Sequence, residues 1–434
     1  MANGSVIEDL IAGRWRDPAT GRPVRTGTRA IVIERSLDGG EADLIAPLAL
    51  GRRLAVVSDR NTFDALGRRV ARALAGIAAI ESVVLDTPRA DLATVDELRA
   101  HTTAAEALLA VGAGTLNDLC KYLAHQSGRP YAVFATAPSM NGYLTGTASL
   151  ARDGFKVSLA ARSPVGAFFD LDVLRQAPGR LIRAGIGDAI CRTTAQADWL
   201  LGYYLRDASY CEAPYLLQVE DERSLLSHAA AVVQGEIEEV AALTRLLVLA
   251  GLGMVMVGGS HPASMGEHLI SHYIDMMARP HPGSLHGEQV GVATLTVSRL
   301  QHALLQAERP PEVRLTRLDE AAMRARYGES RGDAFLAAFR SKALDEAAAA
   351  RMNARLAEVW PAMSARLRDV MLPTARLREA LDAAGAPTRG VDLDLPRGFY
   401  RDAVRHAREI RDRYSILDLA GDAGLLEDFV AEEG

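Results

Sequence analysis

Histidines are concentrated in one short part of the chain. Ten histidines are spread over 434 residues, yet five of them lie between positions 261 and 286. Two of these, His268 and His272, are four residues apart in a helical pattern, so their imidazoles would share one helix face. That is a metal-ligand spacing, and His286 follows in the stretch Leu-His-Gly-Glu. The cluster therefore indicates a divalent-metal site, although ordinary surface histidines on a helix would give the same spacing.

A catalytic metal needs about three protein ligands and an open position for water or substrate. Two histidines and one carboxylate would meet that requirement. The spacing does not choose the carboxylate, which stays open among Glu267, Asp188, Asp275 and Glu288.

A glycine-rich stretch has the composition of an anion site. Residues 112–118 (GAGTLND) follow an apolar run and open a helical segment. Glycine lets the backbone approach an anion closely, and a helix N-terminus offers unpaired N–H groups and the positive end of the helix dipole. The stretch departs from the G-x-G-x-x-G fingerprint because position 117 is Asn, so a plain strand–helix turn explains it equally well. Asp59, which ends an earlier apolar run, is either a ribose ligand or a surface turn residue.

Lysine is rare in this sequence. Of 49 basic residues, only Lys121, Lys156 and Lys342 are lysines. A bias in nucleotide composition accounts for an arginine excess. A retained lysine is also a hint that a compact, deprotonatable ammonium group is needed at its position.

The elements that must position these residues follow a simple pattern. Short apolar runs alternate with helical patterns in the first part of the chain, which predicts a parallel sheet with helices on both faces. The expected strands are 53–59, 82–85, 107–111 and 131–135, and the expected helices are 63–77 and 92–102. After about position 175, helical periodicity continues to the end, with long helices expected at 221–250 and 333–370. We therefore predict a lead-in (1–45), an α/β domain (46–178) and an all-α domain (179–434).

The bulk composition excludes several classes of function. A net charge of −6 gives no electrostatic reason to expect nucleic acid as a partner. No stretch approaches the roughly 18 to 20 uninterrupted apolar residues of a membrane span; the best candidate, 246–258, is interrupted by glycine and indicates a buried helix or strand. The N-terminus has no signal-peptide pattern, and three widely spaced cysteines fit reduced thiols. We expect a cytoplasmic protein, and a homo-oligomer is compatible with the sequence.

Taken together, the chain resembles the sn-glycerol-1-phosphate dehydrogenase family, within the larger group of iron-containing alcohol dehydrogenases, glycerol dehydrogenases and dehydroquinate synthases. The order and spacing of the matching stretches cover roughly residues 50–300. These stretches are AVGAGTLNDLCKY (110–122), ATAPSMNGY (135–143), FFDLDVLRQAP (168–178), AGIGDAICRTTAQADW (184–199), SHPASMGEHLISHYIDM (260–276) and LHGEQVGVATL (285–295).

The resemblance implies a dehydroquinate synthase-like fold, with a dinucleotide-binding α/β domain, an all-α C-terminal domain and an active site in the cleft between them. It places the metal ligands at Asp188, His268 and His286. His272 is then either a cleft residue near the substrate or a partner of the histidine cluster, instead of a ligand. Zn²⁺ suits two histidines and an aspartate, and Ni²⁺ or Fe²⁺ bind similar ligands.

The resemblance also implies the cofactor and the reaction. The stretch that matches the pyrophosphate site includes Gly112, Ala113, Gly114, Thr115 and Asp118, while Thr136 and Ser139 match positions along the nicotinamide and its ribose. Asp59 favours NAD(H), but NADP(H) stays open. The reaction is reversible hydride transfer between the cofactor and dihydroxyacetone phosphate, a small phosphorylated ketone, to give the polyol sn-glycerol 1-phosphate. Lys156, Arg162 and His261 are candidates for contacting the phosphate.

Two positions depart from the family pattern. Asn141 stands where relatives have Asp, and His261 stands where they tend to have Arg. Asn keeps the shape and hydrogen bonding of Asp but carries no charge. Tolerated drift and an altered substrate are both open. So are two other functions, a sugar-phosphate cyclase of the dehydroquinate synthase type that recycles NAD, and a catalytically silent relative.

Overall fold

The computed structural model describes residues 3–17, 20–24, 26–152 and 155–433. These residues form two compact units. The first contains Met1–Ala189 and Glu212–Ser260, and the second contains Ile190–Cys211 and His261–Gly434.

The first unit is built on a six-stranded sheet in which every pair of neighbours is parallel. The strand order is β1-β8-β5-β4-β2-β3. The strands are β1 (Ala30–Glu34), β2 (Arg53–Asp59), β3 (Ala79–Leu85), β4 (Ala107–Gly112), β5 (Tyr131–Ala135) and β8 (Gly166–Asp170). The four predicted strands are all present. Strands β1 and β8 were not predicted. Strand β1 lies inside the predicted lead-in, where it forms a half-buried edge strand.

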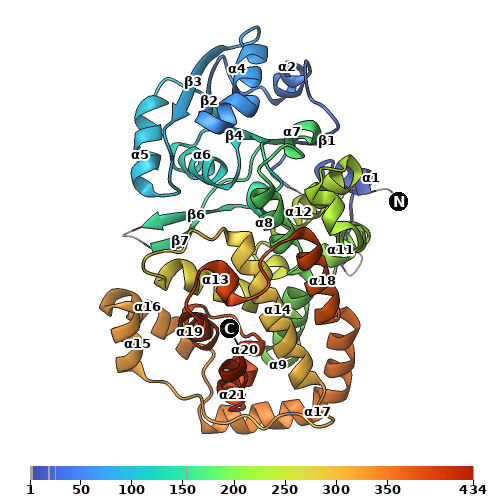
Figure 1. Cartoon of the computed structure of the whole chain (residues 1–434), viewed down its shortest axis with the longest axis vertical. Helices are drawn as coiled ribbons and strands as arrows, with labels where there is room; N and C mark the ends of the chain where they lie inside the picture. The colour runs from blue at the N-terminus through green and yellow to red at the C-terminus, as the bar shows by residue number, and fades with distance from the viewer. Residues whose placement is uncertain (1–2, 18–19, 25, 153–154, 434) are drawn as a thin grey trace. The chain divides into compact units, whose positions relative to one another are not determined.

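Helices cover both faces of this sheet, as predicted (Figure 1). Alternate residues of each strand point to opposite faces. On one face, Leu54 and Val56 pack in a core with Leu66 of η2 (Phe63–Gly67) and Val70 of α4 (Arg68–Leu74). On the other face, α6 (Gly114–Ser127) contacts β2, β4 and β5, and α5 (Leu92–His101) packs against α6.

The remaining elements of the first unit are short, apart from three helices. The short ones are α1 (Asn3–Ile11), α2 (Glu41–Ile45), η1 (Ala46–Leu48), α3 (Arg60–Thr62), η3 (Gly142–Leu144), the antiparallel hairpin of β6 (Thr147–Arg152) and β7 (Phe155–Ala160), α7 (Leu171–Leu174) and α10 (Ala213–Leu216). The longer helices are α8 (Gly179–Ala189), α11 (Val219–Val233) and α12 (Ile237–Val257).

The predicted long helix 221–250 is two helices, α11 and α12. The chain breaks at Gly235, which has φ of +80° and lies so close to Arg175 that a Cβ there would be 3.3 Å from the Arg175 carbonyl oxygen. The apolar surface of α12 packs against α8, α10, α11 and η3. Segment 212–260 therefore packs with the sheet, although its pattern placed it in the helical domain.

Among the described residues, α12 is the one helix long and apolar enough to cross a membrane by length and composition. It is longer than the apolar run expected from the sequence because it begins at Ile237. Of its most apolar 18-residue stretch, 78% is buried inside the structure, so packing within the first unit accounts for its composition.

The second unit is helical throughout its described residues, which confirms the predicted combination of a parallel α/β part and a helical part. Its elements are α9 (Arg192–Arg206), η4 (His261–Ala263), α13 (Gly266–Met277), α14 (His286–Leu305), α15 (Glu320–Tyr327), α16 (Glu329–Arg340), α17 (Glu346–Val370), α18 (Thr374–Ala384), η5 (Gly390–Leu393), α19 (Arg397–His406), η6 (Ala407–Ile410), α20 (Ile416–Asp422) and α21 (Leu426–Glu432). The predicted helix 333–370 is again two helices, because Asp345 caps a new helix by accepting a hydrogen bond from Ala348 N (2.7 Å).

Candidate functional site

The sheet of the first unit brings two predicted cofactor residues to one edge. From β2 the chain moves outward to β3 and then returns to the other side of β2 as β4. In open parallel sheets, ligands bind beyond the carboxyl ends of the strands where the order reverses in this way. Asp59 is the last residue of β2 and Gly112 is the last residue of β4, with Val57 and Ala110 in register. Both residues therefore lie at the edge of the sheet where ligands bind in folds of this kind.

The glycine loop turns sharply between β4 and α6. A Cβ on Gly112 would lie 2.3 Å from Leu116 Cδ1 and 2.9 Å from its Cβ, so the turn requires glycine at this position. Helix α6 begins at Gly114, and the preceding Ala113 has extended backbone and gives no side-chain cap. The first N–H groups of such a helix end have no intrahelical partner, which suits an anionic ligand.

Asp118 and Lys121 fasten neighbouring segments to α6. Asp118 accepts a hydrogen bond from Ser149 N on β6 (3.0 Å) and lies 3.3 Å from Lys121 Nζ. Lys121 is fully buried and donates to the carbonyl oxygens of Gly142 (2.6 Å) and Thr147 (3.0 Å), and burial lowers its pKa. These contacts hold η3 and the start of β6 against α6. A role of Asp118 in cofactor binding stays a prediction.

Asp59 has a local structural role. Its Oδ1 accepts a hydrogen bond from Thr62 N (2.8 Å), and its own N–H donates to Thr62 Oγ1 (2.9 Å), so it caps α3. The predicted contact with a ribose hydroxyl stays a prediction.

The backbones of two helices pack directly against the main chain of the loop that contains Thr136, Ser139 and Asn141. A Cβ on Gly185 of α8 would lie 1.7 Å from Pro138 O, and one on Gly251 of α12 would lie 2.7 Å from Asn141 O. Both of these carbonyl oxygens belong to the main chain, which cannot rotate away as a side chain does. Gly185, the first glycine of the A-G-I-G-D stretch, is therefore required for the packing that positions this loop.

Asn141 holds the carboxylate of Asp188, the residue at the end of that stretch. Asn141 N donates to Asp188 Oδ2 (2.7 Å), and Asn141 Nδ2 donates to Asp188 Oδ1 (3.3 Å). Both residues are buried, with exposed fractions of 9% and 1%. From the sequence, Asn141 was expected on the substrate side of the site. The structure adds a direct contact with a predicted metal ligand.

In the second unit, three of the clustered imidazoles lie together. The packed helices α13 and α14 supply them. The ring centroids of His268 and His286 are 5.1 Å apart, and the His272 ring lies 6.0 Å from each, stacked on His286. His261 instead stacks on Trp199, and burial lowers its pKa to about 4.

The hydrogen bonds of the two predicted histidine ligands select their metal-binding atom. Ring nitrogens of His268 and His286 lie within 4.8 Å of each other. Nδ1 of His268 is 3.0 Å from Glu267 Oε1, and Nδ1 of His286 is 3.1 Å from Ser271 Oγ. A neutral imidazole binds a metal through one nitrogen while the other is hydrogen-bonded. The ligand atom of each ring would therefore be Nε2.

Three of the carboxylates left open by the spacing have structural partners inside the second unit. Glu267 accepts from Met265 N (2.8 Å) and Thr194 Oγ1 (3.2 Å) besides His268. Asp275 accepts from Gln289 Nε2 (3.0 Å) and pairs with His281 (3.1 Å). Glu288 accepts from Leu285 N (2.7 Å) at the start of α14. Each of the three therefore has a structural role inside the second unit, and the choice of Asp188 as the third ligand rests on the family resemblance.

Cys191 also lies close to Glu267 and His268, with one potential ligand atom of each within 4.8 Å of the others. A metal there would replace the hydrogen bonds that Glu267 makes. We therefore interpret this group as a hydrogen-bonded cluster.

The candidates for phosphate binding have different surroundings. Lys156 lies on β7, opposite Ala151 of β6, in the first unit. Arg162 donates to the carbonyl oxygens of Gly128 and Arg129, both at 3.2 Å, so it fastens the end of α6.

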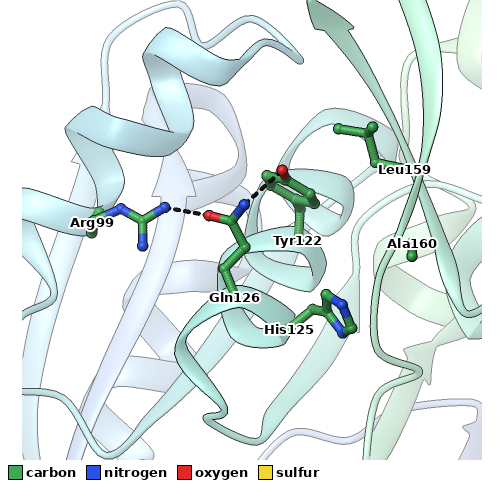
Figure 2. A pocket seen from close by; sticks show the side chains of 6 residues that line it. All are labelled: Arg99, Tyr122, His125, Gln126, Leu159 and Ala160. Carbon is green, nitrogen blue, oxygen red and sulfur yellow. Dashed lines mark hydrogen bonds between the residues drawn. The ribbon is translucent and has the colours of Figure 1, made fainter.

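A hollow of about 570 Å³ lies beside the second half of α6 (Figure 2). Figure 2 shows Gln126 between Tyr122 and Arg99, with hydrogen bonds to both. The other lining residues are His125, Leu159 and Ala160. No predicted site residue lines this hollow, and the glycine loop is at the opposite end of α6.

Comparisons with known proteins identify relatives of this chain. A sequence model described as iron-containing alcohol dehydrogenase matches residues 32–178. A glycerol-1-phosphate dehydrogenase (NAD(P)+) of Geobacillus stearothermophilus is 30% identical over 305 residues, which are 67% of this chain and 76% of that protein. One of the same name from Bacillus velezensis is 29% identical over 384 residues, 86% of each chain.

Solved structures show the same fold. A probable glycerol dehydrogenase from Sinorhizobium meliloti aligns with a TM-score of 0.63 and 18% identity over 93% of this chain and 98% of that one. An iron-containing alcohol dehydrogenase from Thermococcus thioreducens aligns with a TM-score of 0.61 and 12% identity over 94% and 99%. The fold is thus that of the predicted group, and the chain belongs to the glycerol-1-phosphate dehydrogenase family of the iron-containing alcohol dehydrogenases.

Proposed function

We propose that this protein interconverts dihydroxyacetone phosphate and sn-glycerol 1-phosphate with NAD(P)(H) and a divalent metal ion. Family membership supports the reaction. The observation that carries the proposal is the pair of adjacent imidazoles, His268 and His286, whose Nδ1 atoms are both hydrogen-bonded within the protein. That arrangement is typical of histidines that bind a metal through Nε2.

The proposed ligands are Asp188, His268 and His286. Two imidazole nitrogens and one carboxylate oxygen fit Zn²⁺, Ni²⁺ or Fe²⁺. When bound, such an ion polarises the ketone oxygen of the substrate as a Lewis acid. The chain's own residues orient these ligands. Asn141 holds both oxygens of the Asp188 carboxylate, while His272 stacks beside His286 and is proposed to contact the substrate.

The proposed cofactor site is the carboxyl edge of the sheet. The uncapped start of α6 would receive the pyrophosphate, and Thr136 and Ser139 would line the nicotinamide side. An acidic residue at the end of β2 favours the ribose 2′-hydroxyl of NAD over the 2′-phosphate of NADP, so we propose NAD(H) as the preferred cofactor. Lys156 on the β6–β7 hairpin is proposed for the substrate phosphate.

The test is a reconstitution assay. The purified protein is stripped with a chelator, loaded separately with Zn²⁺, Ni²⁺ or Fe²⁺, and given NADH or NADPH with dihydroxyacetone phosphate or unphosphorylated dihydroxyacetone. We expect metal-dependent loss of the reduced nicotinamide with the phosphorylated ketone, and sn-glycerol 1-phosphate as the product. Folded, metal-loaded protein that oxidises neither cofactor would contradict the proposal. Bound NAD with no net change in its redox state during turnover would point to the cyclase alternative.

A further inference from the structure

We infer that Glu267, Ser271 and Gln289 are positioning residues that fix which ring nitrogen of His268 and His286 carries the hydrogen, so that both rings present Nε2 as the metal-binding atom. The inference rests on the proposed function for its metal, but its contacts all lie within the second unit.

The amide of Gln289 has only one orientation that satisfies its neighbours. Its Nε2 lies 3.0 Å from Asp275 Oδ1 and 3.1 Å from Ser284 Oγ. An ionised carboxylate only accepts hydrogen bonds, so the NH₂ group must face Asp275. Gln289 Oε1 then faces Ser271 Oγ at 2.8 Å.

That orientation determines what Ser271 can do. Gln289 Oε1 can only accept, so the single hydroxyl hydrogen of Ser271 points toward Gln289. Ser271 Oγ must therefore accept from His286 Nδ1, 3.1 Å away. Ser271 and Gln289 are both fully buried, so bulk water does not replace these partners. The hydrogen of a neutral His286 ring is thereby held on Nδ1.

His268 reaches the same state through a charged partner. Glu267 is fully buried, and its Oε1 lies 3.0 Å from His268 Nδ1. The carboxylate accepts the Nδ1 hydrogen and is itself held by Met265 N and Thr194 Oγ1. Carboxylates behind a metal-bound imidazole orient the ring and raise its basicity.

The two rings are therefore supported unequally. A carboxylate contacts His268 directly, whereas two neutral side chains, Ser271 and Gln289, lie between His286 and Asp275. Loss of such an outer partner lowers metal affinity by roughly 10- to 100-fold. We expect Glu267→Gln to fall at the upper end of that range and Ser271→Ala at the lower end.

The test measures Zn²⁺ affinity by competition with a chelator, together with ring ¹⁵N shifts in the metal-free protein labelled at histidine. Ser271→Ala should weaken Zn²⁺ binding by about 10-fold and give mixed hydrogen positions on His286. Ser271→Thr, which keeps the hydroxyl, should restore both properties. The matched control is Ser298→Ala, because Ser298 is also buried but bonds to Thr374 on α18 (2.7 Å), and it should leave both properties unchanged.

Gln289→Met provides a second, independent variant. Without the amide oxygen, the Ser271 hydroxyl is able to turn and donate to His286 Nδ1, which moves the ring hydrogen to Nε2 and weakens Zn²⁺ binding. A purely structural role would lower stability without changing the ring ¹⁵N shifts. The inference is overturned if wild-type His286 carries its hydrogen on Nε2, or if Ser271→Ala and Gln289→Met bind Zn²⁺ like the wild type.

These readouts separate the two proposals. Expected affinity losses in a protein that does not reduce dihydroxyacetone phosphate would support the positioning roles and contradict the proposed function. Normal turnover with unchanged affinities would do the reverse.

Discussion

Asn141→Asp would place a second carboxylate against Asp188. The substitution replaces the amide donor, 3.3 Å from Asp188 Oδ1, with an oxygen that only accepts. Two unit charges at that separation repel by about 5 kcal/mol at an effective dielectric constant of about 20. The protein can avoid this repulsion by keeping one of the two carboxyl groups protonated. At pH 7 that costs about 4 kcal/mol, given an ordinary aspartate pKa of about 3.9, so the destabilisation cannot exceed about this value.

We therefore expect Asn141→Asp to lower the free energy of unfolding of the chelator-treated protein by about 2 to 4 kcal/mol. Saturating Zn²⁺ should recover most of that loss, because a divalent cation offsets the repulsion between two carboxylates. The metal-induced increase in stability should thus be larger in the variant than in the wild type. Urea denaturation with chelator and with Zn²⁺ measures both quantities.

Asn141→Ala is the matched control, since it removes the amide donor without adding charge. It should cost about 1 to 2 kcal/mol and should not increase the stabilisation by Zn²⁺. If Asn141→Asp and Asn141→Ala have the same stability in chelator and the same response to Zn²⁺, the side-chain contact with Asp188 does not have the electrostatic importance assigned to it.

Three further outcomes are expected. Gly185→Ala should destabilise the protein by about 3 kcal/mol or more, because the new Cβ would overlap Pro138 O. Gly179→Ala in the same helix is the control and should cost under about 1 kcal/mol, because its Cβ would meet only the flexible end of Arg183. Equal urea midpoints for the two variants would refute the packing argument. Lys121→Met should cost about 3 kcal/mol in urea denaturation, since it removes the buried ammonium partner of Asp118 and two hydrogen bonds to main-chain oxygens. A loss below about 1 kcal/mol would contradict this account. Removing the metal should lower the melting temperature, with about 2.7 kcal/mol of stabilisation regained at a Zn²⁺ concentration 100 times Kd, and a melting temperature independent of Zn²⁺ would argue against the proposed site.

The sequence by itself predicted the parts of this protein that depend on neighbouring residues. The strands near 53–59, 107–111 and 131–135 could be predicted because a short apolar run between turn residues is a local pattern. The turn at the glycine loop before α6 could be predicted for the same reason, and so could the helix that carries the histidines four residues apart, α13. The resemblance rested on the order of several such stretches and predicted the glycerol-1-phosphate dehydrogenase family, which the comparisons confirmed.

Other features were decided by contacts between distant parts of the chain. The edge strand β1 is recognisable only through its pairing with β8, more than 130 positions later. Segment 212–260 has the composition of the helical domain but packs with the sheet, because α12 finds its apolar neighbours there. Hydrophobic periodicity shows that a helix has a buried face but does not identify the surface that covers it.

The hydrogen bonds of the candidate site show the same limit. Asn141 donates to a carboxylate 47 positions away, and Ser271 contacts a ring 15 positions away on the next helix. The spacing of the histidines in the sequence predicted which residue types could bind a metal. Only the tertiary structure shows that Asn141 is a partner of Asp188, and that Glu267 and Ser271 are hydrogen-bonded to the two imidazoles. The reason is that a side-chain hydrogen bond depends on how both backbones pack, which neither sequence pattern determines alone.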